Sequence, residues 1–427
     1  MLVNPAVFDV RFPWADWHQP ATLLRLATIL QKTKRCDVRL IDMLERTKGS
    51  GLKKEQVERL NLDGQQVARW RYGQPISRFV RALQDLSNHP WKPGVVIIEC
   101  LTTFWWEGAA EAANAIRKVF PRARIALVGV YPSLAKRHAL RVVQPHLLLR
   151  HPHRLADVSP AVRRGAIPDF LLVSLGGAAR TAEEVAHEIS RLRSAGVGQF
   201  AISMNQRPDA AKQLAMVLEK LASLGVKAKF IGLGELGARD IVAESALPSL
   251  MKRVGYREIC LSDDRHIPMN SESMGQWLDS HRQAAALFVR AGFELRTRAL
   301  TGSVCVGRRG EDLTERVRAI ALMAHILGSV IIWPYQPESS EFPPNTPLHL
   351  QNGKLFPFRQ ANGYTYRDYL EVLGLAAILN SKYRDKTFDF FSNRLIPNLF
   401  RQSITNRGWE PDPSVKGTTR LPALARA

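Results

Sequence analysis

IPDFLLVSLGGAARTAEEVAHEISR, residues 167–191, is the stretch that decides how the chain is interpreted. Its apolar run 170–173 predicts a strand, the Gly176-Gly177 pair predicts a turn, and Thr181-Ala-Glu-Glu184 is a capping box that predicts the start of a helix. A strand, a glycine turn and a capped helix form the first βα unit of an α/β domain, and such turns usually carry the site. This turn contains no cysteine, histidine or lysine.

Length and charge set the first limits on what the protein can be. With 427 residues the chain is long enough for about two or three domains with cores of their own. The net charge is +21, which suits an anionic partner: a nucleic acid, a phosphate-bearing cofactor or a membrane surface. The alternative is that the basic surface only maintains solubility, since the charge forms no dense run.

The cysteines indicate the compartment. Cys36, Cys100, Cys260 and Cys305 lie far apart, without metal-ligand spacing, and we interpret them as free core thiols in a reducing cytoplasm. We therefore expect no metal site. The first ten residues lack a charged leader region, so no signal peptide is predicted. The longest apolar tract, 319–335, is interrupted by polar residues and predicts no transmembrane span.

Residues 1–150 alternate between strand and helix patterns. We predict strands at 2–4, 37–42, 95–99, 124–128 and 146–149, with helices at 22–33 and 108–119, and a polar helical insertion at about 52–88. Continuous apolar strands alternating with helices predict a parallel sheet buried on both faces. Ligands of such sheets lie beyond the carboxyl ends of the strands.

The predicted strand ends gather aromatic and small polar residues on one rim. Residues 12–20 bring Trp14 and Trp17, residues 102–106 bring Trp105 and Trp106 beside two threonines, and residues 129–133 form a glycine turn. Such a wall suits a large flat ligand. The alternative is that the tryptophans fill the sheet edge or a seam between domains.

The second half of the chain begins after a linker, 151–168, that contains three prolines and the His151-Pro-His153 sequence. Residues 169–337 predict six strand-helix units, which suit a partial barrel of parallel strands. The remaining region, 338–427, predicts aromatic turns, a helix at 369–379 and a basic tail. The predicted strands of the six units are 170–174, 199–203, 227–232, 258–262, 294–301 and 329–334.

Polar residues at the predicted strand ends of these units are the weaker candidates for catalysis: Asn205, Glu235, Asp263 and Asp264. The aspartates begin an Asp-Asp-Arg-His run suited to acid-base chemistry or a metal, or to a simple ion pair with Arg265. Gly232-Leu-Gly234-Glu-Leu-Gly237 matches the dinucleotide fingerprint but does not lie on the first strand of a domain, so a tight turn is the alternative. Hydrolase and NTPase motifs are absent from the sequence.

Three long blocks of sequence resemble radical S-adenosylmethionine proteins with an amino-terminal cobalamin-binding domain. They are LVNPAVFDVRFPWADWHQPATLLRLATIL with CDVRLID, IIECLTTFWWEGAAEAANAIRKVFPRARIALVGVYPSLAKRHA, and GEDLTERVRAIALMAHILGSVIIWPYQPESSEFPPNTPL. The resemblance covers nearly the whole chain. It implies an α/β fold in which a Rossmann-like cobalamin-binding domain precedes a TIM-like partial (β/α)6 barrel and a small carboxyl-terminal region.

The resemblance also implies cofactors. A corrinoid would lie at the rim of the first domain, without a lower histidine ligand, against Thr102, Thr103, Gly129, Tyr131, Pro132 and Ser133. The family's radical chemistry requires CxxxCxxC after the first barrel strand, to hold a [4Fe–4S] cluster through thiolates. Here the strand passes through Leu175 to Ala179 directly into the capped helix. We therefore expect no [4Fe–4S] cluster, and the turn is interpreted as a deleted loop.

Three functions remain open at this point. The first is a pseudoenzyme that binds cobalamin and acts as a scaffold or partner of another protein, such as an active radical S-adenosylmethionine homologue. The second is a methyltransferase that uses cobalamin or S-adenosylmethionine without radicals, with Asn205, Glu235, Asp263 and Asp264 lining its site. The third, supported only by net charge, is a nucleic-acid-binding protein.

Overall fold

The computed structural model describes residues 1–10, 20–32, 36–45, 52–149, 171–174, 181–203, 209–232, 236–262, 271–295, 297 and 299–383. The chain forms two compact units. Unit 1 comprises Met1–Asp169 with Gln336–Pro357, and unit 2 comprises Phe170–Tyr335 with Phe358–Ala427. The region from 338 onward, predicted as a separate extension, is thus shared between the units.

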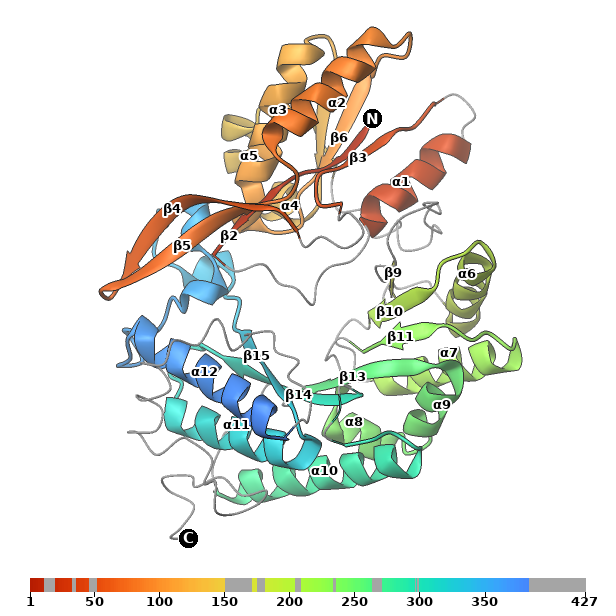
Figure 1. Ribbon diagram of the computed structural model, residues 1–427, viewed down its shortest axis with the longest axis vertical. Helices are drawn as coiled ribbons and strands as arrows, with labels where there is room; N and C mark the ends of the chain where they lie inside the picture. Colours follow the sequence, from red (N-terminus) through yellow and green to blue (C-terminus); the bar gives the residue numbers. More distant parts are fainter. Residues whose placement is uncertain are drawn as a thin grey trace. The chain divides into compact units, whose positions relative to one another are not determined.

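Unit 1 is built on a parallel five-stranded sheet (Figure 1). In sheet order the strands are β3 (Leu40–Asp42), β1 (Leu2–Asn4), β6 (Val95–Glu99), β7 (Arg124–Val128) and β8 (Leu147–Leu148). Every pairing is parallel, as the apolar runs predict. Chain order 2-1-3-4-5 across a sheet is the doubly wound arrangement.

Both faces of this sheet are covered, because successive residues of a strand point to opposite sides. Val3, Val96 and Ile98 pack with helices α2 (Ile76–Asn88), α3 (Trp106–Val119) and α5 (Lys136–Val142). Leu2, Ile97 and Ala126 pack with α1 (Ala21–Lys32) on the other face. The prediction of a sheet buried on both faces is therefore confirmed for unit 1.

The predicted helical insertion at 52–88 is wrong in its first part. Residues 54–72 form an antiparallel hairpin of β4 (Lys54–Leu62) and β5 (Gln65–Tyr72), and β5 also pairs with β2 (Val7–Asp9). The turn residues Asp63 and Gly64 both have positive φ, 52° and 81°, and Asp-Gly is a preferred pair for such two-residue turns. Strand β4 is largely exposed, so its polar residues hide the alternation of a strand.

The hairpin is attached to α3 by buried cations. Arg71 donates through Nε to both carboxylate oxygens of Glu111, at 3.0 and 2.9 Å, and Arg69 pairs with Glu107. Gly108 lies between these glutamates, and a Cβ there would lie 1.8 Å from the carbonyl oxygen of Ala6. The glycine thus lets α3 approach the chain between β1 and β2.

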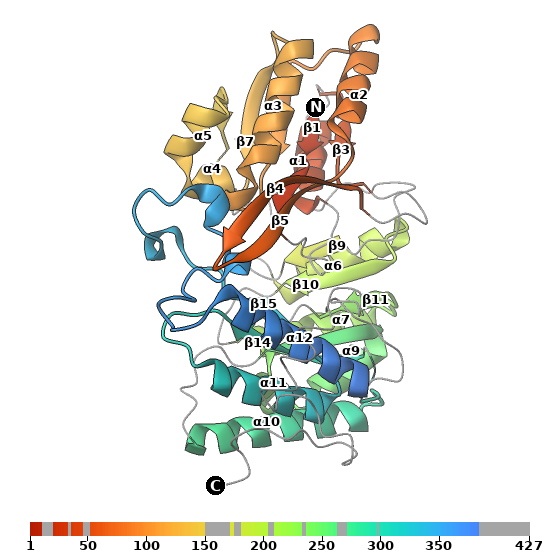
Figure 2. The same ribbon diagram turned by 60° about the vertical axis from the view of Figure 1, so that its left-hand side comes forward.

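Unit 2 contains a second parallel sheet whose strands follow one another in chain order (Figure 2). The sequence of strands is β9 (Leu171–Ser174), β10 (Gln199–Ser203), β11 (Lys229–Ile231), β13 (Tyr256–Ser262), β14 (Leu300–Val306) and β15 (Val330–Pro334), with the short β12 (Leu236–Gly237) beside β13. The six predicted strand-helix units are therefore present and parallel. Closure into a partial barrel stays a prediction.

The helices of unit 2 follow the strands closely. Thr181 and Glu184 form the predicted capping box of α6 (Ala182–Ser194), with Thr181 Oγ1 accepting from Glu184 N at 3.2 Å. Residues 238–254 form two helices, with Pro248 in the first turn of the second. The helices along the sheet are α6, α7 (Ala210–Ser223), α8 (Ala238–Ala243), α9 (Leu247–Val254), α10 (Ser271–Arg290) and α11 (Leu313–Leu327).

One predicted strand lies in the wrong place. The expected strand 294–301 is β14 at 300–306, so Thr301 and Ser303 lie inside the strand and not beyond its end. Both side chains are buried, Thr301 against Ser329 and Ser303 against the backbone of Leu261. The loop at the carboxyl end of this strand is instead 307–312.

The carboxyl-terminal helix α12 (Tyr366–Tyr383) includes the predicted 369–379 and covers the edge strand β15. Asn380 donates to the carbonyl oxygen of Val330 and accepts from its N–H, both at 2.8 Å. This side chain thereby pairs with backbone groups that an edge strand leaves open. Among the helices of the described ranges, none has the length and apolar character needed to span a membrane.

Candidate functional site

The first sheet has a topological switch point at its centre. Helix α1 covers one face of the sheet, and α3, which follows β6, covers the other. Strands β1 and β6 are neighbours, and the segment directly after β1 packs against α3 at Gly108. In doubly wound sheets this switch point is where ligands bind.

Three polar residues end the three neighbouring strands at this point. Asp42 ends β3, Asn4 ends β1 and Glu99 ends β6. The side chains two positions earlier, Leu40, Leu2 and Ile97, pack with α1, so all three polar residues belong to the α1 face. Asp42, Asn4 and Glu99 are called the switch-point row below.

Hydrogen bonds satisfy one end of this row. Asn4 donates through Nδ2 to Asp42 Oδ1 at 2.8 Å, and the N–H of Leu44 donates to the same oxygen at 3.0 Å. Asn4 is itself buried, with 8% of its surface exposed. The orientation of Asn4 is therefore fixed by Asp42, which uses one of the two N–H groups of the Asn4 amide.

Glu99 lies at the other end and differs sharply. Only 2% of its surface is exposed, and the Thr22 hydroxyl of α1 approaches its carboxylate without full hydrogen-bond geometry. Burial raises the pKa of Glu99 to about 7, and the negative charge of Asp42 raises it further. The Thr22 hydroxyl of α1 acts in the opposite direction. Glu99 is thus a buried acid that changes charge near neutral pH.

The loops beyond β6 and β7 carry the predicted ligand-binding residues. Thr102 Oγ1 is buried and has no hydrogen-bond partner in the described residues. Gly129 has a φ of 115°, and a Cβ on it would lie 2.3 Å from the carbonyl oxygen of Cys100. Only glycine permits this close approach of the two strand ends. Cys100 is buried, and its Sγ–H donates to the carbonyl oxygen of Thr102 at 3.3 Å.

The other predicted residues of this group are placed differently. Tyr131 is fully buried, and its hydroxyl bonds to His138 Nδ1 at 2.9 Å. Thr103 and Pro132 are also buried, in η2 (Thr103–Trp105) and α4 (Val130–Leu134). Ser133 is exposed but donates back to the carbonyl oxygen of Gly129 at 2.9 Å. Their contact with a corrinoid stays a prediction, and Thr102 is the one with an unused buried polar atom.

The rim tryptophans are only partly described. Trp14 and Trp17 lie outside the described residues. Trp105 and Trp106 are half-buried against the core, and the Trp106 ring meets His138 edge-on at 5.0 Å between centroids. These two side chains are therefore part of the packing of unit 1, in agreement with the alternative that they fill the sheet edge.

A buried carboxylate ties the returning chain to the same rim. Asp9, with 1% of its surface exposed, accepts from Trp105 Nε1 at 3.1 Å and from Asn352 Nδ2 at 2.9 Å, and it forms an ion pair with Lys354. Asn352 and Lys354 belong to the segment Gln336–Pro357 of unit 1. Unlike Glu99, Asp9 has donors for both of its oxygens.

The candidate residues of unit 2 cannot be placed. Asn205, Glu235, Asp263 and Asp264, like the turn Leu175 to Ala179, lie outside the described residues. Of the glycine motif, Gly232 follows β11 and Gly237 lies in β12, which pairs with β13 before α8 begins. A strand inside the motif departs from the direct strand-turn-helix context that dinucleotide binding requires.

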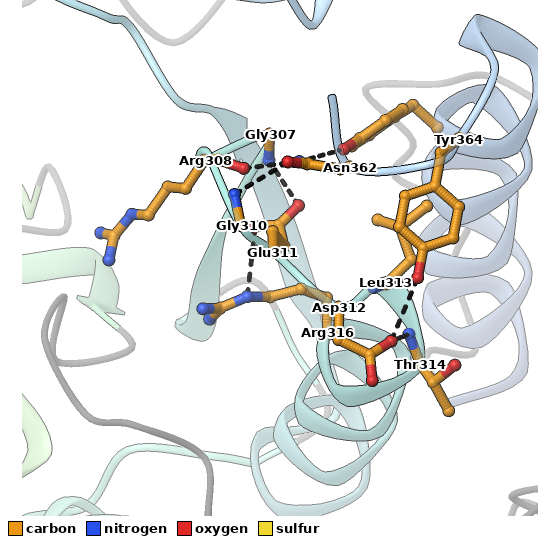
Figure 3. A network of polar contacts seen from close by, with 11 residues as sticks. Gly307, Arg308, Gly310, Glu311, Asp312, Leu313, Thr314, Arg316, Asn362 and Tyr364 are labelled. Atoms are coloured by element: carbon orange, nitrogen blue, oxygen red, sulfur yellow. Dashed lines mark hydrogen bonds and ion pairs between the residues drawn. The ribbon is translucent and has the colours of Figure 1, made fainter. Parts of the chain in front are cut away.

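The described loop at the carboxyl end of β14 holds a second buried acid that the sequence analysis missed (Figure 3). Glu311 Oε1 accepts from the N–H of Gly307 at 2.7 Å, and Arg316 Nε lies 3.2 Å from Oε2. Asn362 accepts from the N–H of Gly310 at 2.8 Å and donates to the carbonyl oxygen of Arg308. Burial raises the pKa of Glu311 to about 7, although the N–H of Gly307 and the charge of Arg316 act to lower that pKa.

The four cysteines form no disulfide, as predicted, but not all lie in the core. Cys36 is exposed, which corrects the expectation of four core thiols, and Cys260 and Cys305 are half-buried. Glu99 was not predicted as a site residue either. Its signal is present in the sequence, since it is the one charged residue that ends the apolar run VVIIE.

Comparisons with known proteins do not identify a family. No protein-family model matches the sequence, and no curated protein matches it significantly. Solved structures with some similarity include active domain 2 of a thermostable chitinase from Pyrococcus furiosus, at 13% identity and a TM-score of 0.25 over 67% of this chain and 91% of that chain. A catalytic domain of hyperthermophilic chitinase from the same organism gives a TM-score of 0.24 at 13% identity with the same coverage. Similarity this low carries no argument about fold or activity.

Proposed function

We propose that this protein binds a corrinoid at the switch-point crevice of unit 1 and acts as a scaffold or partner of another protein, without radical chemistry of its own. The proposal treats the chain as a degenerate relative of radical S-adenosylmethionine proteins that carry an amino-terminal cobalamin-binding domain. The observation that carries it is the buried hydroxyl of Thr102 at the switch point, which has no hydrogen-bond partner among the described residues.

The order of the two sheets supports this relationship. A doubly wound five-stranded sheet precedes a parallel sheet whose six main strands follow the chain order. The resemblance implies the same order, a Rossmann-like cobalamin-binding domain followed by a partial (β/α)6 barrel. The proposal therefore includes a cobalamin-binding type of fold for unit 1 and a partial (β/α)6 barrel for unit 2.

The residues at the crevice fit a corrinoid in three respects. A corrinoid is a broad macrocycle with peripheral carboxamides, so it needs both an open rim and polar partners at its edge. Thr102 Oγ1 offers an unused hydroxyl at the rim. Gly129 keeps the loop beyond β7 close to Cys100 without a side chain above it, and the buried Tyr131 supports that loop from below.

The absence of radical chemistry rests on the sequence. Cluster-forming enzymes of the family need three closely spaced cysteines, and the stretch between Cys100 and Cys260 contains none. A corrinoid bound without a cluster can still be presented to an active partner. A cytoplasmic homologue with its own cluster is the kind of partner that this proposal requires.

The test is production of the full-length protein in cells supplied with cobalamin, followed by an absorption spectrum and an iron assay. We expect a corrinoid absorption band that remains after gel filtration, with no stoichiometric iron. A protein that never retains corrinoid would contradict the binding proposal. Stoichiometric iron would contradict the loss of the cluster.

A matched pair of variants makes the test specific to the rim. Thr102→Val removes the unpartnered hydroxyl, whereas Thr28→Val removes a hydroxyl in α1 that already donates to the carbonyl oxygen of Leu24. We expect weaker corrinoid binding only in Thr102→Val. Equal binding by both variants would place the corrinoid elsewhere.

A further inference from the structure

The positive charge of unit 1 is concentrated in one stretch of the chain. Residues 112–149 contain seven lysines and arginines and no aspartate or glutamate. The other described residues of unit 1 contain twelve lysines and arginines and thirteen aspartates and glutamates, so they are close to neutral. The seven cations are Arg117, Lys118, Arg122, Arg124, Lys136, Arg137 and Arg141.

Two helices bring part of this charge together at their ends. Lys118 is in the last turn of α3, and Arg141 is in the last turn of α5. Arg117 joins the two ends, because its Nη2 donates to the carbonyl oxygen of Gln144 at 2.7 Å and also to that of Val143. Lys118 and Arg141 therefore lie at the same end of unit 1.

The start of β7 lies at this end as well. Arg124 is the first residue of β7, and Arg122 precedes it in the turn after α3. The N–H of His146, just after α5, donates to the carbonyl oxygen of Ile125 at 2.8 Å, and the Ile125 N–H donates to His146 Nδ1 at 3.0 Å. The chain leaving α5 thus runs beside the first residues of β7, so Arg122 and Arg124 continue the same surface.

Helix α5 extends this surface along the outer side of unit 1, beyond β7 (Figure 2). Ala139 is buried, whereas Lys136, Arg137, Leu140 and Arg141 are exposed on the other side of the helix. Residues four apart lie side by side on a helix, so Arg137 neighbours Arg141 and Lys136 neighbours Leu140. The surface formed by Lys118, Arg122, Arg124, Lys136, Arg137 and Arg141 is called the basic edge below.

The cations of the basic edge have no acid to balance them. All six side chains are exposed, and none forms an ion pair with a residue in the described ranges. Elsewhere in unit 1, Arg69, Arg71 and Lys354 each pair with a carboxylate. Glu111, the last acid before the stretch, is already the partner of Arg71. The charge of the basic edge is therefore available to a partner.

The charges on α5 also oppose the helix that carries them. Lys136 and Arg137 occupy its first turn, where the positive end of the helix dipole disfavours cations, and no acidic residue accompanies them there. Arg137 and Arg141 are like charges four residues apart, which destabilises a helix. Burial and the charge of Arg141 lower the pKa of His138, one turn earlier. Such local conflicts are expected at surfaces that serve binding.

We propose that the basic edge binds the phosphate backbone of duplex nucleic acid without reading its sequence. Five of the seven cations in the stretch are arginines, whose planar guanidinium matches two phosphate oxygens at once. The aromatic side chains of the stretch, Phe120 and Tyr131, are both buried, so unpaired bases have no ring to stack on. A duplex suits this surface, because it carries one phosphate charge for about every 1.7 Å of its length.

An anionic membrane surface is the competing partner for the same charges. Proteins that bind membranes in this way place an apolar helix face or several apolar side chains beside the cations. The apolar side of α5 is instead packed in the core of unit 1, through Ala139 and Val143. Leu134 and Leu140 are the exposed large apolar side chains on α4 and α5. Two leucines provide little area for insertion, so nucleic acid fits the basic edge better.

The experiment measures binding of the full chain to a fluorescein-labelled DNA duplex of about 20 base pairs. Fluorescence anisotropy gives the association constant at salt concentrations from about 50 to about 200 mM. The test variant is Arg122→Gln/Arg124→Gln/Arg141→Gln, which removes three exposed cations of the basic edge.

The matched control removes the same charge elsewhere in unit 1. It is Arg59→Gln/Arg78→Gln/Arg81→Gln, in which all three arginines are exposed and lie outside the basic edge. Circular dichroism during thermal unfolding checks that both variants fold as the wild type does.

The wild type should lose about a thousandfold in association constant between about 50 and about 200 mM salt, as about six phosphate contacts require. The test variant loses half of these contacts, so the fall should shrink to about fortyfold. Its affinity at about 100 mM salt should be at least about tenfold lower than that of the wild type. The control variant should stay within about twofold of the wild type at each salt concentration.

Other results would overturn the proposal. Equal losses in the test and control variants would reduce the effect to net charge. Wild-type affinity in the test variant would place nucleic-acid binding elsewhere in the chain. No binding of the duplex at about 50 mM salt would contradict the proposal outright. Binding to phosphatidylserine vesicles that is lost in the test variant would then assign the basic edge to a membrane.

Nucleic-acid binding and corrinoid binding can be tested separately. The corrinoid is proposed at the carboxyl ends of the strands, whereas the test variant changes the amino end of β7 and the last turn of α5. Corrinoid retention should therefore be unchanged in the test variant, and the failure of one proposal would leave the other standing.

Discussion

Glu99 of unit 1 and Glu311 of unit 2 occupy comparable places and have opposite surroundings. Each lies at or just beyond the carboxyl end of a parallel strand, each is more than nine-tenths buried, and burial raises the pKa of each to about 7. Glu311 bonds to the N–H of Gly307 and pairs with Arg316. Glu99 has the Thr22 hydroxyl of α1 as a weak partner among the described residues.

The difference lies in how the chain uses each carboxylate. Glu311 fixes the loop 307–312 from within, through one hydrogen bond to the backbone and one ion pair. Glu99 has the Thr22 hydroxyl of α1 as its neighbour and no such loop to hold. A raised pKa is common to both, so the raised pKa alone does not distinguish the two acids.

Replacing Glu311 with alanine gives the largest expected change. The variant leaves the N–H of Gly307 without its acceptor and Arg316 without its ion pair, so the free energy of unfolding should fall by ~3 kcal/mol. The free energy of unfolding should fall by less in Glu99→Ala, which breaks no such contact. Urea unfolding of both variants measures this, and an equal loss would erase the distinction between the two acids.

Replacing Glu99 with glutamine should stabilise the protein at alkaline pH. Because its pKa is raised from 4.5 to about 7, the folded state binds this proton more tightly than the unfolded state. The contribution of Glu99 to the free energy of unfolding is therefore fully present below pH 4.5. It is lost as the pH rises through 7, and the loss is on the order of 3 kcal/mol. Removing the charge should recover ~1–2 kcal/mol at about pH 8.

The measurement for Glu99→Gln is the free energy of unfolding at about pH 5 and about pH 8. As the pH rises, the free energy of unfolding should fall less in Glu99→Gln than in the wild type. A variant that is less stable than the wild type at the higher pH would reveal partners for Glu99 and so contradict the comparison.

The side chain of Asn362 tests whether the loop around Glu311 is held as a unit. Asn362→Ala removes the acceptor for the Gly310 N–H and the donor to the Arg308 carbonyl oxygen, and it should cost ~1–2 kcal/mol. In a double mutant with Glu311→Ala, the loss in the free energy of unfolding should be smaller than the sum of the two single losses, since both side chains hold one loop. Strict additivity in urea unfolding would indicate two independent supports.

The hydroxyl of Thr102 should matter least for stability. Thr102→Val replaces an unpartnered buried hydroxyl with a methyl group of similar size, so the free energy of unfolding should change by less than ~0.5 kcal/mol or rise slightly. A thermal unfolding curve for this variant, beside the Thr28→Val control, is sufficient. A large loss would show that Thr102 already has a structural partner.

The parallel sheets could be predicted because their strands are continuous apolar runs. Residues 95–99 and 124–128 form strands with the predicted bounds, and the Thr181 capping box begins its helix at the predicted position. These signals are local, so neighbouring sequence is sufficient to predict them. The same reasoning failed for the hairpin at 54–72, because its strand β4 is largely exposed and polar and β5 buries arginines.

The candidate site was predictable only in part. The rim loops at 102–106 and 129–133 were found from their positions after apolar strands, and the structure adds that the Thr102 hydroxyl is buried without a hydrogen-bond partner among the described residues. The burial of Tyr131 was missed, because a side chain of a helical turn can point to the core or to the rim. Glu99 and Glu311 were missed because a sequence shows a charge but not whether the fold supplies it with donors.

Corrinoid retention by the wild-type protein is the measurement that tests the central claim most directly. The purified full-length protein is incubated with cyanocobalamin at about pH 8, where Glu99 is ionised, and the complex is separated by gel filtration. The account predicts an equimolar corrinoid absorption in the protein fraction. A protein fraction free of corrinoid, with unit 1 shown to be folded by hydrogen exchange, would contradict it.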